Sequence, residues 1–411
     1  MKISGGWEKH KGLIFIIAVF IITRIVYYFY FGIRFDTSPL DFYWQYVDPY
    51  LLKTDLLRSV YYLHSQPPLF NLFLGIVLKL SPVNYGIIFG LCYSVLGLSF
   101  AVSLFLVMTE LGVSDILAVV LTSLFMISPF TVLYENWLFY EYPTAVLLCL
   151  SLLFFHRFVS DGKFVNGVIL FTLLAFIVLT RSMFHMFWFI GIAIVLILYR
   201  THDYKKVILA FIIPLAIVSS VYAKNLYVFK TFSLGSEYIG HNIARMTTFE
   251  LPESLRKKLI KENSISPVCS MQIFSSVSAY EPYIKFKKTG IPLLDREYKT
   301  TGFVNAHNLA YLDISNRYLH DAFYVARHYP SICLRSLMRY YKKYFLPPSN
   351  TWPFNEENLN YMKIGGLDRI FNLLFFGQKT LFFVIVIFIL YLVILKIFMN
   401  TPLNKKIRLI C

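Results

Sequence analysis

The segment Ile14–Phe31, IFIIAVFIITRIVYYFYF, decides the class of fold, because it is apolar along nearly its whole length. Coiled as an α-helix, its 18 residues extend about 27 Å, close to the roughly 30 Å hydrocarbon core of a bilayer. The preceding residues Met1–Lys11 are short and basic, and no small-residue cleavage site follows. The pattern predicts a retained membrane span rather than a removed signal peptide.

Further apolar runs repeat along the chain. Of the 411 residues, 57% are apolar and 15% charged, and the mean hydropathy is +0.60. Runs of spanning length lie near residues 13–31, 85–108, 116–133, 143–158, 164–180, 183–199, 207–223 and 379–398. The sequence therefore predicts an all-α, polytopic membrane protein with about eight transmembrane helices, interfacial helices and a mainly helical outer domain.

The formal charge of +16 does not indicate nucleic acid as a partner, because the basic residues fall in short loops and one long polar segment. That distribution is typical of a protein whose partner is a lipid bilayer. Phe and Tyr are abundant, with 40 and 30 copies, as in interfacial aromatic belts.

The run Pro68–Leu80 is too short to span, and charge decides whether to count it. With eight crossings and without this run, basic loop residues such as Lys163 and Arg200 fall on the cytoplasmic side. We therefore expect residues 1–223 to form a transmembrane module, with a first outer loop at 32–67 and a short interfacial helix at 68–80. Residues 224–377 would form an outer domain, and 378–411 a last span and a basic cytoplasmic tail.

In the outer domain, the stretches His307–Tyr318 and His320–Tyr344 have apolar residues at helical spacing. The second stretch carries basic residues suited to anionic head groups: Arg327, Arg335, Arg339, Lys342 and Lys343. Cys269 and Cys333 both lie in this segment, and the sequence does not decide whether they form a disulfide.

The first outer loop carries Asp36, Asp41 and Asp48 among aromatic residues. Carboxylates at a membrane face repel anionic head groups, so anchoring does not explain them. One of the three is a candidate general base for an acceptor hydroxyl. Asp41 and Asp48 are seven residues apart and would share one face of a helix. The structural alternatives are a capping box from Ser38 to Asp41 and a helix cap at Asp48 before Pro49.

Four polar residues outside the first-loop acids are candidates for substrate binding near the membrane. His64 and Gln66 precede Pro67-Pro68, a rigid elbow that either aims them into a cavity or only turns the chain. Arg181 and His185 are four apart in a tight hairpin, on one face if helical, and Arg181 is suited to clamp a phosphate or to snorkel to the interface.

Glu135 and Glu141 lie between two predicted spans, where carboxylates are costly unless wet or paired. One of the pair Glu135 and Glu141 is a candidate for substrate binding or for a metal site. Together with Asp41, Glu141 is a candidate ligand of Mg²⁺, Mn²⁺ or Ca²⁺, the hard cations that take oxygen ligands. The alternative is an aromatic belt with Glu141 at a helix start. His241 and Arg245 in the outer segment are candidates for sugar or acceptor contacts. No phosphate-binding P-loop, GxSxG or HExxH occurs in the sequence.

On these residues the chain resembles the membrane-embedded GT-C glycosyltransferases, such as protein O-mannosyltransferases and the aminoarabinose transferase of lipid A. Acids outside the first span (Asp36, Asp41), the elbow Pro67-Pro68-Leu69, and an acid between later spans (Glu135, Glu141) carry the resemblance over roughly the first 200 residues. It implies a sugar donor on a polyprenyl phosphate, a lipid, glycan or protein acceptor, Asp41 or else Asp36 as base, and Arg181 at the donor phosphate. The paired Asp-Glu typical of that loop is absent, since Phe42 follows Asp41, and only one span follows the outer segment.

The expected function is an inverting transfer on the extracytoplasmic face, in a bacterial cytoplasmic membrane. The alternatives are a polysaccharide or lipid transporter, which predicts ionisable residues at mid-membrane depth, and an enzyme like O-antigen ligases or polymerases. The last would depend on His241 and Arg245 rather than on the first-loop acids.

Overall fold

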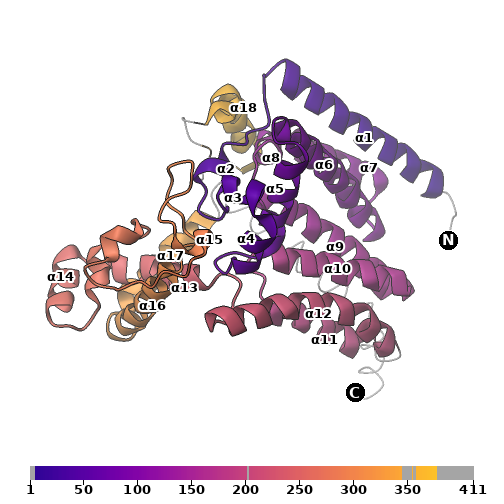
Figure 1. Cartoon of the computed structure of the whole chain (residues 1–411). Coiled ribbons are helices and arrows are strands. Elements are labelled where there is room, and N and C mark those ends of the chain that lie inside the picture. Colours follow the sequence, from indigo (N-terminus) through magenta and orange to yellow (C-terminus); the bar gives the residue numbers. More distant parts are fainter. Residues whose placement is uncertain (1–4, 201–202, 345–353, 355–357, 377–411) are drawn as a thin grey trace. The chain divides into compact units, whose positions relative to one another are not determined.

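The computed structural model describes residues 5–200, 203–344, 354 and 358–376 (Figure 1). The chain divides into two units: residues 1–127 with 131–340, and residues 128–130 with 341–411. The second unit contains α18 (Leu359–Phe376). The first unit contains the apolar helices, apart from residues 128–130, and the predicted outer segment up to residue 340. The candidate catalytic, substrate-binding and metal-binding residues named above all belong to it.

Helices are the only regular elements among the described residues; the two β-bridges, Asp36–Trp137 and Tyr298–Val304, are isolated. The prediction of an all-helical fold is therefore confirmed. The apolar helices are α1 (Gly5–Phe29), α6 (Tyr85–Glu110), α7 (Asp115–Ile127), α8 (Pro129–Glu135), α9 (Glu141–Asp161), α10 (Phe164–Thr180), α11 (Met186–Tyr199) and α12 (Tyr204–Phe229). The first loop forms α2 (Pro39–Phe42), α3 (Pro49–Thr54), α4 (Leu56–Tyr62) and α5 (Pro68–Leu80). The outer segment forms α13 (Ser236–Met246), η1 (Thr248–Glu250), α14 (Glu253–Lys261), η2 (Pro267–Ser270), η3 (Val277–Tyr280), α15 (Pro292–Asp295), α16 (Ala310–His328) and α17 (Pro330–Tyr344).

Four of the described helices are long and apolar enough to cross a membrane: residues 10–29 of α1, and α6, α9 and α12. A fifth span results if α7 and α8 are taken together, although they meet at an angle of 62°. With 17 and 14 residues, α10 and α11 are shorter. The predicted run at 379–398 lies outside the described residues. The protein is thus a helical integral membrane protein, and the predicted number of eight spans is not confirmed.

The run predicted at 116–133 is interrupted because Pro129 has no N–H and disfavours a helical conformation at Ser128. The carbonyl groups left open at the end of α7 find partners on α1. The Arg24 guanidinium donates to the Met126 carbonyl at 2.7 Å, and the Tyr27 hydroxyl donates to the Ile127 carbonyl at 2.8 Å. The bend is thus stabilised from the neighbouring helix.

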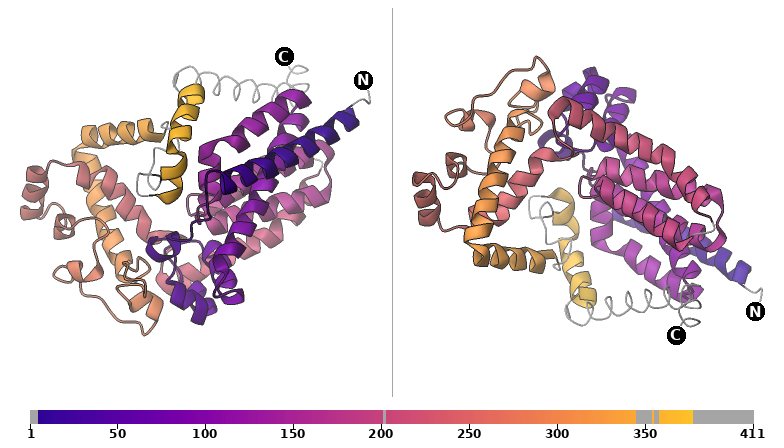
Figure 2. Two further views of the ribbon diagram at one scale, coloured as in Figure 1. Left: turned by 90° about the horizontal axis from the view of Figure 1, so that it is seen from above. Right: turned by 90° about the horizontal axis from the view of Figure 1, so that it is seen from below.

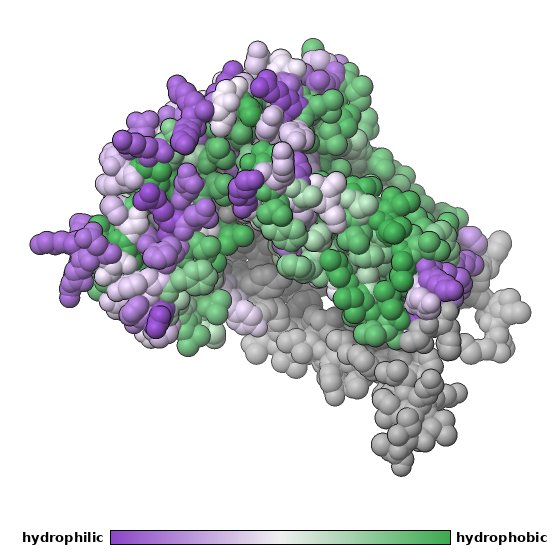
Figure 3. All heavy atoms as spheres, turned by 60° about the horizontal axis from the view of Figure 1, so that its bottom comes forward, coloured by the Kyte–Doolittle hydropathy of each residue, from purple (hydrophilic) through white to green (hydrophobic). Residues whose placement is uncertain are grey.

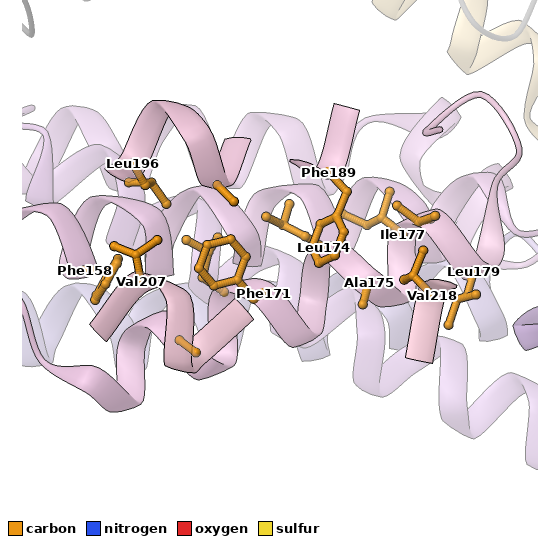
Figure 4. Close-up of a cluster of buried hydrophobic side chains, with 14 of the residues drawn as sticks. Phe158, Phe171, Leu174, Ala175, Ile177, Leu179, Phe189, Leu196, Val207 and Val218 are labelled. Atoms are coloured by element: carbon orange, nitrogen blue, oxygen red, sulfur yellow. The ribbon is translucent and has the colours of Figure 1, made fainter. Parts of the chain in front are cut away.

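The apolar helices pack side by side, with α6 against α1, α7 and α9, and α10 against α9, α11 and α12. A buried cluster drawn from α9 to α12 fills the space between those four helices; Phe158, Phe171, Phe189 and Val207 lie in it (Figure 4). Large apolar side chains such as Ile22, Leu91, Ile213 and their neighbours remain exposed on the outside of the bundle. Because water would penalise such a surface, it fits a lipid environment.

Charged side chains gather where α9 ends and α10 begins. Arg157 lies 2.7 Å from Glu110 at the end of α6, and Arg200 donates to the Val159 carbonyl at 2.7 Å and to Asp203. Lys206 lies 3.0 Å from Asp203. This end of the bundle is therefore the opposite one from Glu141 and Arg181, since α9 and α10 run between the two.

The outer-segment helices lie together beyond one end of the apolar helices (Figure 2). On the face that Figure 3 shows, hydrophilic residues are more frequent over the outer segment than over the bundle. Their core centres on α13 against α16, where Gly240 allows close contact: a Cβ at this position would lie 1.9 Å from the Ser315 carbonyl oxygen. Cys269 and Cys333 are both free thiols, so no disulfide joins them.

Candidate functional site

The first loop is hydrogen-bonded to the connection between α8 and α9. The Asp36 N–H donates to the Asn136 carbonyl at 2.8 Å, and the Leu138 N–H donates to the Asp36 carbonyl at 3.0 Å. The Asp36 carboxylate accepts from the Ser38 N–H at 2.9 Å, a local turn. Segments about 100 residues apart therefore meet at the same face of the bundle.

Asp41 lies on the one-turn helix α2, and its side chain is exposed. The Thr301 hydroxyl donates to the Asp41 main-chain carbonyl at 2.9 Å, which leaves the carboxylate itself open. Partial burial raises the pKa of Asp41, and the positive charge of Lys299 opposes this rise. The capping box predicted from Ser38 to Asp41 is wrong, because Ser38 is in the αR region and its side chain makes no cap hydrogen bond.

Asp48 is buried, and its oxygens have several donors. It accepts from the Tyr50 N–H at 3.0 Å, the Thr300 N–H at 2.8 Å and the Thr300 hydroxyl at 2.6 Å. The structural alternative, a cap for α3, is therefore confirmed. The expectation that Asp41 and Asp48 share a helix face is wrong, because α2 ends at Phe42 and α3 begins only at Pro49.

Lys299 joins the outer segment to the first loop, and the sequence did not indicate this residue. Its side chain is 3% exposed, and its Nζ donates to the Tyr43 carbonyl. Burial lowers the pKa of Lys299 to about 7, opposed by the nearby charges of Asp48 and Asp41. Because the acceptor is a main-chain carbonyl, no residue pattern in the first loop marks the contact.

Aromatic rings connect the first loop to Arg181. The Tyr43 ring centroid lies 4.5 Å from that of Phe139, the Phe139 centroid lies 4.2 Å from that of Tyr140, and the Arg181 guanidinium lies 4.7 Å from the Tyr140 centroid. Burial raises the pKa of the Tyr43 hydroxyl, and the negative charges of Glu141 and Asp36 raise it further. The first loop and Arg181 are therefore connected through three aromatic rings.

Arg181 and Glu141 form an ion pair at 2.9 Å, between the end of α10 and the start of α9. Arg181 ends α10 and His185 caps α11, accepting from the Phe187 N–H at 3.4 Å. The two residues thus belong to a turn, and the expectation that they share a helix face is wrong.

An apolar groove of about 480 Å³ lies between α5, α6, α9 and α10. Phe70 and Phe73 of α5 and Leu91 of α6 line it, together with Pro143 and Thr180. Pro143 is two residues from Glu141, and Thr180 directly precedes Arg181. The groove therefore reaches the helix ends that carry the ion pair.

Glu135 has a different environment from Glu141. Its carboxylate accepts from Arg24 Nε at 3.0 Å and from the Tyr142 hydroxyl at 2.9 Å, and it is buried among apolar helices. Arg24 was missed in the sequence, although an arginine within an apolar run is itself a signal for a buried partner.

The two candidates that precede the Pro67-Pro68 elbow lie in buried positions. His64 and Gln66 are buried, and the His64 ring lies 4.7 Å from that of Phe229, between centroids. Next to His64, the Ser65 hydroxyl bonds to Nδ1 of His307. Burial lowers the pKa of His64 to about 4 and that of His307 to about 3.

In the outer segment, His241 and Arg245 are not brought to one surface. The His241 ring is buried and stacks on Phe274 at 5.0 Å between centroids, whereas the Arg245 side chain is exposed on the last turn of α13.

Within the part of the chain that the structure describes, no group of three or more His, Cys, Asp or Glu side chains is placed to hold a metal ion. The predicted cation ligands Asp41 and Glu141 do not form part of such a group. No protein-family model, curated protein or solved structure matches this chain.

Proposed function

We propose that this helical membrane protein is a glycosyltransferase that moves a sugar from a polyprenyl-phosphate donor to an acceptor hydroxyl on the extracytoplasmic face. The observation that carries the proposal is the apolar groove, whose lining includes Pro143, two residues from Glu141, and Thr180, which directly precedes Arg181. A polyprenyl chain suits a lipid-facing apolar groove, and an arginine beside it suits the phosphate at the end of that chain.

In the proposed reaction the acceptor oxygen attacks the anomeric carbon from the side opposite the phosphate, so the configuration inverts. The bond from the anomeric carbon to the phosphate oxygen breaks, and its electron pair leaves with the polyprenyl phosphate, whose charge Arg181 stabilises. The acceptor proton passes to the Asp41 carboxylate. A raised pKa makes Asp41 a better base than an ordinary aspartate, and its exposed side chain supports this role.

The face is proposed from charge. Arg157, Lys163, Arg200 and Lys206 belong to the end of the bundle opposite Glu141, and basic residues favour the cytoplasmic side. Counting the short helices α10 and α11 as crossing or not changes the number of crossings by two. In both cases α12 therefore ends on the same side of the membrane.

The test is a transfer assay with the purified protein and a panel of polyprenyl-phosphate sugars, comparing Asp41→Asn with the wild type. We expect the variant to fold normally and to lose transfer. Asp313→Asn, an exposed carboxylate of α16, is the matched control and should keep activity. Full activity of Asp41→Asn removes Asp41 from the mechanism. Loss of activity in Arg245→Gln would instead favour the ligase-like alternative.

A lipid or polysaccharide transporter is the second candidate, because the Arg24–Glu135 pair is ionisable and buried among apolar helices. A transporter moves its lipid substrate across the bilayer with the sugar–phosphate bond intact. Recovery of unchanged donor on the opposite leaflet of proteoliposomes would favour it.

A further inference from the structure

The helix α17 (Pro330–Tyr344) presents two different faces. Ile332 and Cys333 pack against the buried cluster of the outer segment, and Ser336 is buried. On the other side three large apolar side chains are exposed: Leu334 by 61%, Leu337 by 52% and Met338 by 50%. Positions i, i+3 and i+4 line one stripe of a helix, so these side chains form a continuous apolar strip.

The charges around this strip are basic. The helix Pro330–Tyr344 contains no acidic residue, and Arg335 follows Leu334 directly with an exposed side chain. Arg327 and His328 end the preceding helix α16. Arg339 lies 2.9 Å from Glu250, and this ion pair joins α17 to η1 within the outer segment. An apolar strip with a basic flank is complementary to a lipid surface with anionic head groups.

We infer that the apolar strip of α17 lies in the interface of the same bilayer that α1, α6, α9 and α12 can span. Leu334, Leu337 and Met338 enter the boundary between head groups and acyl chains, and the neighbouring basic residues contact anionic lipids. The outer segment is thereby anchored to the membrane surface at a point outside the spanning helices. This inference does not depend on the proposed enzymatic activity.

The test uses the full-length protein in vesicles that contain phosphatidylglycerol, with a fluorescent label at Met338→Cys. Cys92, Cys149, Cys333 and Cys411 are replaced by alanine, and the buried Cys269 is kept because it is not accessible to the reagent. Asp313→Cys, an exposed position of α16, is the control site. Circular dichroism of each labelled protein verifies that the helices are retained.

We expect the label at position 338 to have blue-shifted emission, to be quenched by lipids brominated near the head group, and to be protected from aqueous iodide. The label at position 313 should show the reverse. Equal quenching of both labels by iodide would overturn the inference. Protection from iodide without quenching by the brominated lipid would also overturn it, because the strip would then be covered by protein, for example a second copy of the chain.

Discussion

The Arg181 guanidinium lies 2.9 Å from the Glu141 carboxylate, so the cation proposed to meet the donor phosphate already has an anionic partner. Both side chains are partly exposed, by 27% and 37%, so a ligand can reach them. A phosphate that binds Arg181 must therefore share the guanidinium with Glu141 or displace it.

This competition predicts opposite effects for the two partners. Arg181→Gln removes the charge-assisted hydrogen bonds to phosphate, worth about 1.5–3 kcal/mol, and should raise the KM for the lipid donor roughly tenfold to a hundredfold. Glu141→Gln keeps the size of the side chain but removes the competing charge, and should lower that KM. Donor-dependence curves for both variants test this. A rise in KM for both would mean that Glu141 itself binds the donor.

The raised pKa of Asp41 predicts the acidic side of the pH profile. A base must be deprotonated, so kcat/KM should fall as the pH drops through a value above the ordinary aspartate pKa of about 4. Lys299→Met removes the positive charge that lowers the pKa of Asp41, and the acidic limb should move to higher pH. The control is Lys288→Met, an exposed lysine of the same segment. An unchanged acidic limb in Lys299→Met would show that Lys299 does not affect the pKa of Asp41.

The Arg24–Glu135 pair predicts strong coupling in stability. Removing one partner leaves the other charge buried, so Arg24→Gln and Glu135→Gln should each cost about 3–5 kcal/mol. The double variant should cost clearly less than the sum, because neither charge remains. Equilibrium unfolding in one detergent, arranged as a double-mutant cycle, measures the coupling. Additive losses would show that the pair is not an energetic unit.

We expect a side chain at position 97 to disturb the Arg24–Glu135 pair sterically. A Cβ at this position would lie 2.6 Å from Oε2 of Glu135, so Gly97→Ala should displace the carboxylate and cost about 1–3 kcal/mol. Gly191→Ala in α11 is the matched control, because a Cβ there meets no atom within 4 Å. Thermal unfolding of the two variants should differ in this direction. Equal stability would mean that α6 shifts to accommodate the methyl group.

The helical fold was predictable because apolar runs of spanning length leave few alternatives in a membrane. Two predicted spans differ from the observed helices, and both differences have local causes. The run at 116–133 is broken at Ser128-Pro129, although Pro129 was visible in the sequence. The run at 183–199 begins only at Met186, because the turn after Thr180 extends to His185.

The candidate site was predictable only in part. The sequence indicated the carboxylates and Arg181, but not which of them pair. Glu135 and Glu141 are six residues apart and have different arginine partners, which no local pattern distinguishes. Lys299 was missed because its contact with the Tyr43 carbonyl depends on how the outer segment folds back onto the first loop, 256 residues away in sequence.

The most direct measurement is the fate of the donor. The purified wild-type protein is incubated with a panel of polyprenyl-phosphate sugars and an acceptor extract, with and without a chelator. The lipid product is analysed by mass spectrometry, and the anomeric configuration of the glycosylated acceptor by NMR. We predict that at least one donor is converted to free polyprenyl phosphate and that its sugar appears on an acceptor hydroxyl with inverted configuration. Recovery of every donor intact, by a protein that binds the same lipids, would contradict the proposal of a glycosyltransferase.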